Sequence, residues 1–261
     1  MKLFWILLTA HVLADFVMQS DGMIKEKKKH RVIVFMYHSL IHSGVALSML
    51  TLVNSTWFSR ILVAIVVGFT HFLVDFLIQK INRSKRVLFV FFVDQLIHLS
   101  ILIVLIAFFQ NEITDFSSLF LTFIGYLHSI FGPWNHPGLH SFSMLKLIPI
   151  VLITIFAGNV VVKKILEDCS VLKESIEEPG EVATGRLIGL FERLIIFLLV
   201  ITNNIAATTW ILTAKSIVRF DKIRDSKDGK NYAEYYLIGT LSSSAFAILM
   251  GLLGRLLLRG Y

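Results

Sequence analysis

Long apolar runs alternate with short polar segments along this chain of 261 residues. In the first part of the chain the runs lie at residues 3–19, 32–53, 59–79 and 87–109. An α-helix needs about 20 residues to cross the hydrocarbon core of a bilayer, so each run predicts a membrane-spanning helix. Short polar connections join the four predicted helices, which favours an all-α fold with an N-terminal four-helix bundle.

The second part of the chain contains further apolar runs, at residues 116–131, 142–162, 194–213 and 235–258. The first of these is short for a span, and it is followed by the Gly- and Pro-rich residues 132–138, which predict a loop. The total is eight predicted spans. We therefore expect a four-helix domain at 1–110 and a C-terminal region at 111–261 with about four more membrane segments.

The composition supports a polytopic membrane protein. Hydrophobic residues make up 56% of the chain and charged residues only 16%, and the mean hydropathy is +0.75. These values exclude a soluble cytosolic enzyme, for which about a quarter of the residues are charged. Although the net charge is +7, the basic residues lie mostly in loops between apolar runs, so we do not expect nucleic acid as a partner. The single cysteine, Cys169, can form neither an intramolecular disulfide nor a thiolate metal cage.

The loops between the first four runs differ sharply in charge. Two of them carry nine basic residues: Lys25, Lys27, Lys28, Lys29, Arg31, Lys80, Arg83, Lys85 and Arg86. The two intervening segments, 54–57 and 110–115, carry no Lys or Arg. Cytoplasmic loops of membrane proteins are rich in Lys and Arg, so the pattern predicts a multi-pass protein of the cell membrane with its N terminus outside.

An internal repeat runs through these four helices. The segment His11–Gln19 matches His71–Gln79 at its His, Leu, Asp, Phe and Gln positions, with an offset of 60 residues. The segment His38–His42 corresponds to Asp94–His98 with an offset of 56. The repeat predicts a duplicated helical hairpin, whose two copies are parallel because each runs from outside to inside and back.

Each repeated segment places two potential metal ligands four residues apart, on one face of a helix. All four pairs lie at a similar depth in their runs, so a bundle would bring together up to eight ligands: His11, Asp15, His38, His42, His71, Asp75, Asp94 and His98. Imidazoles and carboxylates without thiolates favour Zn²⁺, with Mn²⁺ and Fe²⁺ as alternatives. Eight donors exceed one tetrahedral shell, which predicts two ions or additional supporting residues, among them Gln19, Gln79 and Gln95.

A single buried His or Asp is most often an ordinary hydrogen-bonded residue. Eight such residues at one depth in a bilayer need a common compensation, which is either a metal or a proton pathway. We favour the metal because three carboxylates nearly cancel the charge of two divalent ions.

The motifs His-x-Leu-x-Asp-Phe-x-x-Gln and Asp-Gln-x-x-His resemble those of a bacterial membrane family catalogued as domain of unknown function 3307. Segments 189–193, 214–220 and 233–240 extend the resemblance into the C-terminal half. The resemblance implies a bacterial inner-membrane protein but no activity. More distantly, the His- and Asp-bearing helices are similar to those of membrane-bound metal-dependent hydrolases, which is an analogy of fold.

The predicted site suits several functions. In a metal-dependent hydrolase, Asp15 or Asp75 would be the general base, and the substrate would be a lipid or phosphoester at the cytoplasmic leaflet. Three residues of the C-terminal half are candidates to contact the substrate: Glu192, Lys215 and Arg219. Lys215 and Arg219 could hold its anionic group, although cytoplasmic anchoring is the simpler interpretation of both. The alternatives are a divalent-metal transporter or sensor and a purely structural metal. No Walker loop or dinucleotide fingerprint supports ATP or nicotinamide chemistry, and the sequence does not reveal an oligomeric state.

Overall fold

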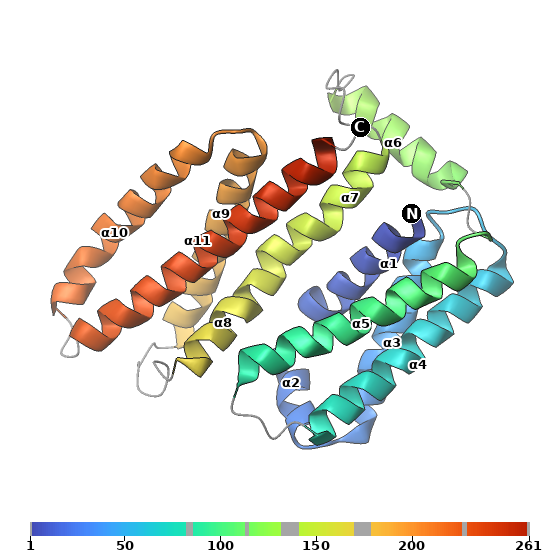
Figure 1. Ribbon diagram of the computed structural model, residues 1–261, viewed down its shortest axis with the longest axis horizontal. Helices are drawn as coiled ribbons and strands as arrows, with labels where there is room; N and C mark the ends of the chain where they lie inside the picture. The colour runs from blue at the N-terminus through green and yellow to red at the C-terminus, as the bar shows by residue number, and fades with distance from the viewer. Residues whose placement is uncertain are drawn as a thin grey trace. The chain divides into compact units, whose positions relative to one another are not determined.

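A computed structural model describes residues 2–81, 86–112, 115–131, 141–169, 179–225 and 229–259, and Figure 1 shows their arrangement. These residues form helices joined by turns, with one isolated bridge between Val53 and Phe116 and no strand among them. The predicted all-α class is confirmed. Arg83, Lys85 and the predicted loop 132–138 lie outside the described residues.

The chain divides into two compact units. Unit 1 comprises Met1–Ser84 and Phe89–Pro149, and unit 2 comprises Lys85–Leu88 and Ile150–Tyr261. The prediction that residues 1–110 form a four-helix domain of their own stays a prediction.

Unit 1 contains the elements that carry the predicted ligands. They are α1 (Lys2–Val12), the π-helix η1 (Leu13–Val17), α2 (Asp21–Lys28), α3 (Val32–Leu50), α4 (Trp57–Ile81) and α5 (Val87–Phe109), followed by α6 (Ser118–Phe131) and most of α7 (Ser141–Leu152). Helix α1 packs against α3, and α3 packs along α4 (Figure 1).

The basic segment after the first apolar run is helical rather than a loop. The helix of Lys2–Val17 bends by 82° into α2, which starts where the Ser20 hydroxyl accepts a hydrogen bond from the Met23 amide, 3.3 Å away. His30, with a φ of 56°, then turns the chain into α3. The prediction of a loop at 25–31 is therefore wrong for its first residues, because the Ser20 cap starts a short helix there.

A close approach of backbones joins α3 to α4. The Ser39 hydroxyl donates a hydrogen bond to the carbonyl oxygen of Gly68, at 2.7 Å. A Cβ atom at Gly68 would lie 2.9 Å from the Ser39 carbonyl oxygen and 1.9 Å from the Ser43 hydroxyl oxygen. Small residues at such a contact let membrane helices pack closely. The contact lies one helical turn before His71, so it sets how near His71 comes to α3.

Unit 2 consists of the π-helix η2 (Ile153–Ala157), α8 (Gly158–Asp168), α9 (Pro179–Ile201), the 3₁₀-helix η4 (Ile205–Ala207), α10 (Thr208–Asp225) and α11 (Gly229–Arg259). The predicted single span at 194–213 is wrong, since α9 ends at Ile201 and Asn203 adopts a φ of 67°. Asn tolerates this left-handed conformation better than most residues, and helix α10 starts anew five residues later.

Five helices are long and apolar enough to cross a membrane: Val32–Leu50, Trp57–Lys80, Val87–Phe109, Leu145–Asp168 and Ala233–Leu258, and the bent pair Lys2–Val17 with Asp21–Lys28 is a sixth if it counts as one span. The predicted total of eight is thus too high for the described residues. In the C-terminal region two long spans stand where about four were predicted, because the chain breaks at Asn203 and α6 has only 14 residues.

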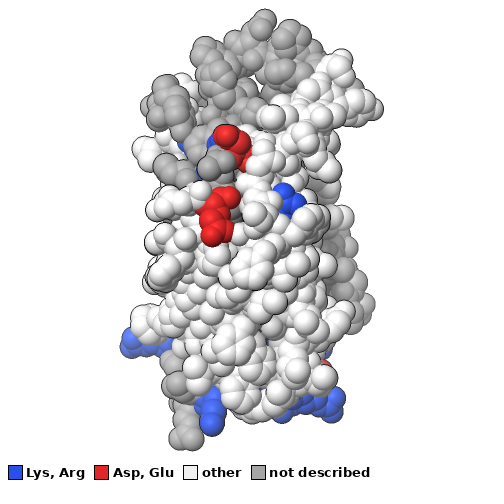
Figure 2. Space-filling view, turned by 90° about the vertical axis from the view of Figure 1, so that its right-hand side faces the viewer, with Lys and Arg blue, Asp and Glu red and all other residues white. Residues whose placement is uncertain are grey.

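Large apolar side chains cover the outside of these helices. Phe58 on α4 and Phe108 on α5 are each 76% exposed. In Figure 2, the face toward the viewer shows a broad band without charged side chains, with Lys and Arg at one end and Asp and Glu, together with some Lys or Arg, toward the other. An apolar band of this kind is costly in water and suits a lipid environment. The helices therefore fit a membrane protein.

Candidate metal centre

The eight predicted ligands meet inside unit 1. His11 lies on α1, Asp15 on η1, and the other three pairs lie on α3, α4 and α5. Their nitrogen and oxygen atoms form three overlapping groups in which all ligand atoms lie within 4.8 Å of one another: His11, Asp15, His42 and His71; His38, His71 and Asp75; and Asp75, Asp94 and His98. His71 and Asp75 each belong to two groups, so the three groups form one continuous cluster.

One carboxylate, that of Asp15, lies among four imidazoles. The Nε2 atoms of His38 and His42 lie 3.0 and 3.1 Å from its Oδ1. The Nε2 atom of His71 lies 3.5 Å from the same oxygen, and that of His11 lies 3.4 Å from Oδ2. Asp15 belongs to a π-helical turn, a local widening of the helix that occurs frequently at functional sites.

The other two carboxylates lie together at the α4 and α5 side of the cluster. The Nε2 atom of His98 is 3.6 Å from Asp75 Oδ1 and 3.4 Å from Asp94 Oδ1. The Nε2 atom of His71 is 3.5 Å from Asp75 Oδ2, so His71 connects this part of the cluster to Asp15. The cluster thus has an imidazole-rich half around Asp15 and a carboxylate-rich half around Asp75.

The predicted spacing of four residues brings the members of each pair together. The ring nitrogen and the carboxylate oxygen lie 3.4 to 3.5 Å apart in all three His/Asp pairs. In the fourth pair, the rings of His38 and His42 have centroids 4.7 Å apart. The two residues of each pair therefore share a face, as residues one helical turn apart should.

Several buried ring nitrogens in the cluster lack hydrogen bonds. Within the described residues, His38 Nδ1, His71 Nε2 and His98 Nε2 make none, although each of these rings is at most 4% exposed. Buried polar atoms are normally satisfied, so each such atom calls for an explanation. The two Nε2 atoms face carboxylate oxygens at 3.4 to 3.6 Å, beyond the usual hydrogen-bond range of about 2.7 to 3.2 Å.

These separations suit ligands of a common metal ion. With bonds of about 2.0 to 2.2 Å to nitrogen and oxygen, two ligand atoms of a tetrahedral zinc ion lie roughly 3.3 to 3.5 Å apart. The unpartnered nitrogens, the neighbouring carboxylates and the absence of thiolates from the cluster therefore fit a zinc-like ion.

Residues 3–125 match the family described as "Protein of unknown function (DUF3307)". The match covers all eight clustered residues and ends at residue 125, so the likeness of the C-terminal segments to this family stays a prediction. Comparison with curated proteins and with solved structures gives no match. The DUF3307 match supports the family resemblance but brings no activity with it.

Amide side chains surround the ligands in the DUF3307 region. Gln95 Nε2 lies 3.2 Å from Asp94 Oδ2 and 3.4 Å from Asp15 Oδ2, while its Oε1 lies 3.4 Å from His11 Nε2. Gln19 Nε2 lies 3.4 Å from His38 Nε2. Both were predicted as supporting residues, and Gln95 in particular touches both halves of the cluster. The supporting role of Gln79 stays a prediction.

One charged residue of the cluster was missed by the sequence analysis. Lys27, predicted as a cytoplasmic loop residue, is 8% exposed and its ammonium group binds Asp75 Oδ2. It also lies 5.7 Å from the centre of the Phe35 ring. The Ser20 cap, followed by Met23 and Lys27 on one face, signals a short helix here, but it does not signal that Lys27 points into the protein.

The predicted substrate residues of the C-terminal half lie in unit 2. The ammonium group of Lys215 lies 2.5 Å from Glu192 Oε2, so these two candidates pair with each other. The side chain of Arg219 lies outside the described residues. The role of all three in binding substrate stays a prediction.

Arg193 is the second residue that the sequence analysis missed. It is 2% exposed and donates hydrogen bonds to the carbonyl oxygens of Thr154 and Ile155, both at 3.0 Å. It also donates to Asn159 Oδ1 at 2.5 Å and to Ser243 Oγ at 3.2 Å. The π-helix η2 leaves carbonyl groups that need hydrogen-bond donors. We therefore infer that Arg193 stabilises unit 2 by donating to them.

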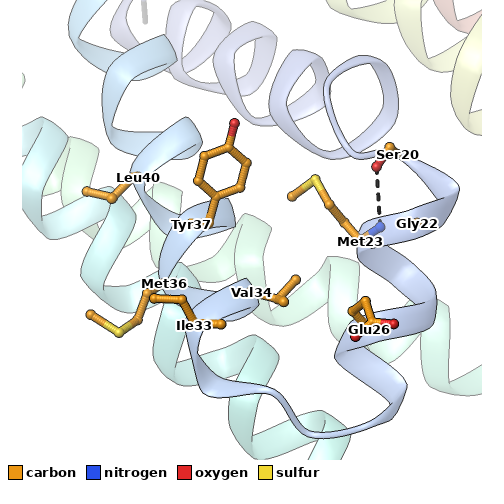
Figure 3. A pocket seen from close by; sticks show the side chains of 9 residues that line it. All are labelled: Ser20, Gly22, Met23, Glu26, Ile33, Val34, Met36, Tyr37 and Leu40. Atoms are coloured by element: carbon orange, nitrogen blue, oxygen red, sulfur yellow. Dashed lines mark hydrogen bonds between the residues drawn. The ribbon is translucent and has the colours of Figure 1, made fainter.

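An apolar groove of about 490 Å³ lies between α2 and α3 in the DUF3307 region. Figure 3 shows Met23 on α2 facing Tyr37 and Val34 on α3, with Glu26 at the edge of α2. The residue after Tyr37 is the cluster member His38. The groove therefore lies beside one of the helices that carry the cluster.

Proposed function

We propose that the cluster in unit 1 is an intramembrane metal centre and that the protein is a metal-dependent hydrolase. The observation that carries the proposal is the set of buried imidazole nitrogens that face carboxylate oxygens at 3.4 to 3.6 Å without a hydrogen bond. Burying these groups in a membrane is costly unless they bind something, and a divalent ion satisfies nitrogens and carboxylates at once.

Zinc is the ion that the donors favour. The cluster offers five imidazoles and three carboxylates, a set that suits Zn²⁺ and, less well, Mn²⁺ or Fe²⁺. A duplicated helical hairpin explains why the set is built from four similar pairs. Eight donors are enough to hold either one ion or two.

Hydrolysis of a phosphoester is the chemistry that such a centre supports. A zinc ion held by these residues would lower the pKa of a coordinated water and polarise a phosphoryl oxygen. The residues of the chain do the rest: Asp15 or Asp75 accepts the proton of the attacking water, and Gln95 holds the carboxylates of Asp15 and Asp94 in place. Burial of the cluster keeps bulk water away from the reacting groups.

A membrane lipid or lipid-linked phosphoester is the substrate class that we propose. The groove between α2 and α3 is lined mostly by apolar side chains, among them Met23, Ile33 and Leu40, as an acyl chain requires. The basic helix α2 lines one side of this groove, and basic residues attract anionic headgroups. With the basic segments on the cytoplasmic side of the inner membrane, the substrate would enter from the cytoplasmic leaflet.

The hydrolase proposal is tested with purified protein in lipid nanodiscs that contain phosphatidylglycerol and phosphatidic acid. Zinc is supplied at one to two equivalents, and released phosphate and headgroups are followed by ³¹P NMR and mass spectrometry. We expect turnover by the wild type and by His30→Asn, which changes an exposed histidine outside the cluster to a residue that tolerates its positive φ, and a loss of at least 100-fold in His71→Ala. Equal turnover by His71→Ala, or none by zinc-loaded wild type across a panel of phospholipids, contradicts the proposal.

A divalent-metal transporter or sensor is the second candidate. Its support is that His71 and Asp75 are shared between neighbouring ligand groups, so an ion can pass from one group to the next without leaving its ligands. Proteoliposomes that contain a zinc-sensitive dye test this alternative. Zinc entry that depends on His71, together with no phosphoester cleavage, would replace the hydrolase by a transporter.

A further inference from the structure

Lys27 places a positive charge inside the cluster. It is one of the few buried lysines among the described residues, and its ammonium group binds Asp75, the carboxylate shared by two of the three ligand groups. The neighbouring Phe35 ring, itself 1% exposed, lies 5.7 Å from the Lys27 nitrogen and adds a weak cation–π attraction. The other basic residues of α2, Lys25 and Lys28, are exposed.

The two halves of the cluster differ in charge. The half around Asp15 has one carboxylate with four imidazoles, which are enough donors to hold one ion and still leave a position for water. The half around Asp75 has two carboxylates, one further imidazole and the Lys27 ammonium group. An ammonium group and a metal ion cannot both lie against the same carboxylate oxygen without strong repulsion.

The charges of the cluster cancel when it holds a single divalent ion. Three carboxylates contribute −3, Lys27 contributes +1, and one divalent ion contributes +2, so the cluster with a single ion is neutral. A second divalent ion would leave a net charge of +2 before any bound hydroxide is counted. A net charge buried in a low-dielectric environment is costly, so the arrangement with one ion is favoured.

We propose that Lys27 is a tethered cation that occupies the second cation position of the centre. The centre then binds a single divalent ion, in the half around Asp15, and Lys27 serves as the second positive charge. The catalytic part of this role rests on the hydrolase proposed above. In that enzyme the ammonium group would hold an anionic oxygen of the phosphoester opposite the metal. Lys27 is thus the residue that sets the metal stoichiometry.

The test is the number of zinc ions bound per chain. Detergent-purified protein is stripped with a chelator, loaded with a fourfold excess of zinc, desalted and measured by elemental mass spectrometry. We expect one equivalent in the wild type, in Lys27→Arg, which keeps the charge, and in Lys28→Met, which removes an exposed charge from the same helix. Lys27→Met should bind close to two equivalents, because one ion would leave the cluster with a charge of −1, whereas two ions with one bound hydroxide are neutral.

A double variant separates the charge from other effects. Lys27→Met combined with Asp75→Asn removes one charge of each sign, so we expect it to return to one equivalent. Size-exclusion chromatography shows whether each variant is folded. If Lys27→Met is not folded, two equivalents in Lys27→Arg would still overturn the proposal. Two equivalents in the wild type or in Lys27→Arg, or one in folded Lys27→Met, overturns the assignment of Lys27 but leaves the metal centre standing. No zinc in the wild type overturns both.

Discussion

At the scale of single residues, the proposed metal centre depends on buried ring nitrogens that make no hydrogen bond in the part of the chain that the structure describes. His71 and His98 lie deep in unit 1 and their Nε2 atoms face carboxylates without hydrogen bonds within the described residues. The hydrogen-bonded part of the network instead holds the ligands in position. Gln95 is its central member, because its amide lies near ligands on α1, η1 and α5.

Replacing Gln95 by Leu tests this positioning role. Loss of an outer-shell hydrogen-bond partner typically weakens metal binding by about 10- to 100-fold, and we expect a decrease in that range. Competition with a zinc-binding dye measures the affinity. Gln110→Leu, which changes an exposed glutamine just after α5, is the control and should bind zinc like the wild type. A Gln95→Leu variant with wild-type affinity would show that the amide does not position the ligands.

At the scale of helices, the approach of α3 to α4 brings the ligands of one helix to those of the other. Stacked rings of His42 and His71, with centroids 3.5 Å apart, show how close the two helices come. Gly68 permits this distance, because any larger residue there would meet the backbone of Ser39 and the side chain of Ser43.

Gly68→Ala should therefore destabilise unit 1. Overpacking at a tight contact costs about 1 to 3 kcal/mol, which we expect to appear as a lower Tm in detergent. Gly44→Ala on α3 is the matched control, since a Cβ at Gly44 meets nothing within 4 Å, and its Tm should not fall. Equal Tm values for the two variants would mean that α3 and α4 are not held at this distance.

Much of the arrangement of helices follows from the sequence, and the exceptions have physical causes. The long apolar runs of α3, α4 and α5 and the spacing of four residues within each ligand pair were predictable from periodicity alone. Asn203 was not, because a single left-handed residue interrupts an otherwise continuous apolar run without changing its hydropathy. Lys27 was not, because a basic residue in a short cap-initiated helix looks the same whether it points to lipid or into the protein.

At the scale of the whole molecule, the distribution of charge predicts orientation in the membrane. Basic residues lie on α2 between the first two apolar helices, whereas the segment 54–57 between α3 and α4 carries no Lys or Arg. This pattern predicts that α2 lies on the cytoplasmic side and that the N terminus and residues 54–57 face the outside.

Cysteine labelling tests this orientation. In a background of Cys169→Ala, the exposed residues Asn54 and Lys28 are replaced singly by Cys and treated with a membrane-impermeant maleimide. In right-side-out vesicles we expect labelling at Asn54→Cys and not at Lys28→Cys, and the reverse in inside-out vesicles. The opposite pattern would place the basic helix, and the approach of an anionic substrate, on the outer side.

The metal content of the protein, purified in detergent without chelators, tests the proposed metal centre most directly. Elemental mass spectrometry compares the wild type with His71→Ala, with Asp94→Ala/His98→Ala and with the control His30→Asn. We expect about one equivalent of zinc in the wild type and the control, a clear loss in His71→Ala, and at most a partial loss in Asp94→Ala/His98→Ala, which changes the half without the ion. A wild type that contains no metal, and takes up none on reconstitution, would rule out the metal centre and leave the eight residues as a proton pathway or a polar packing network.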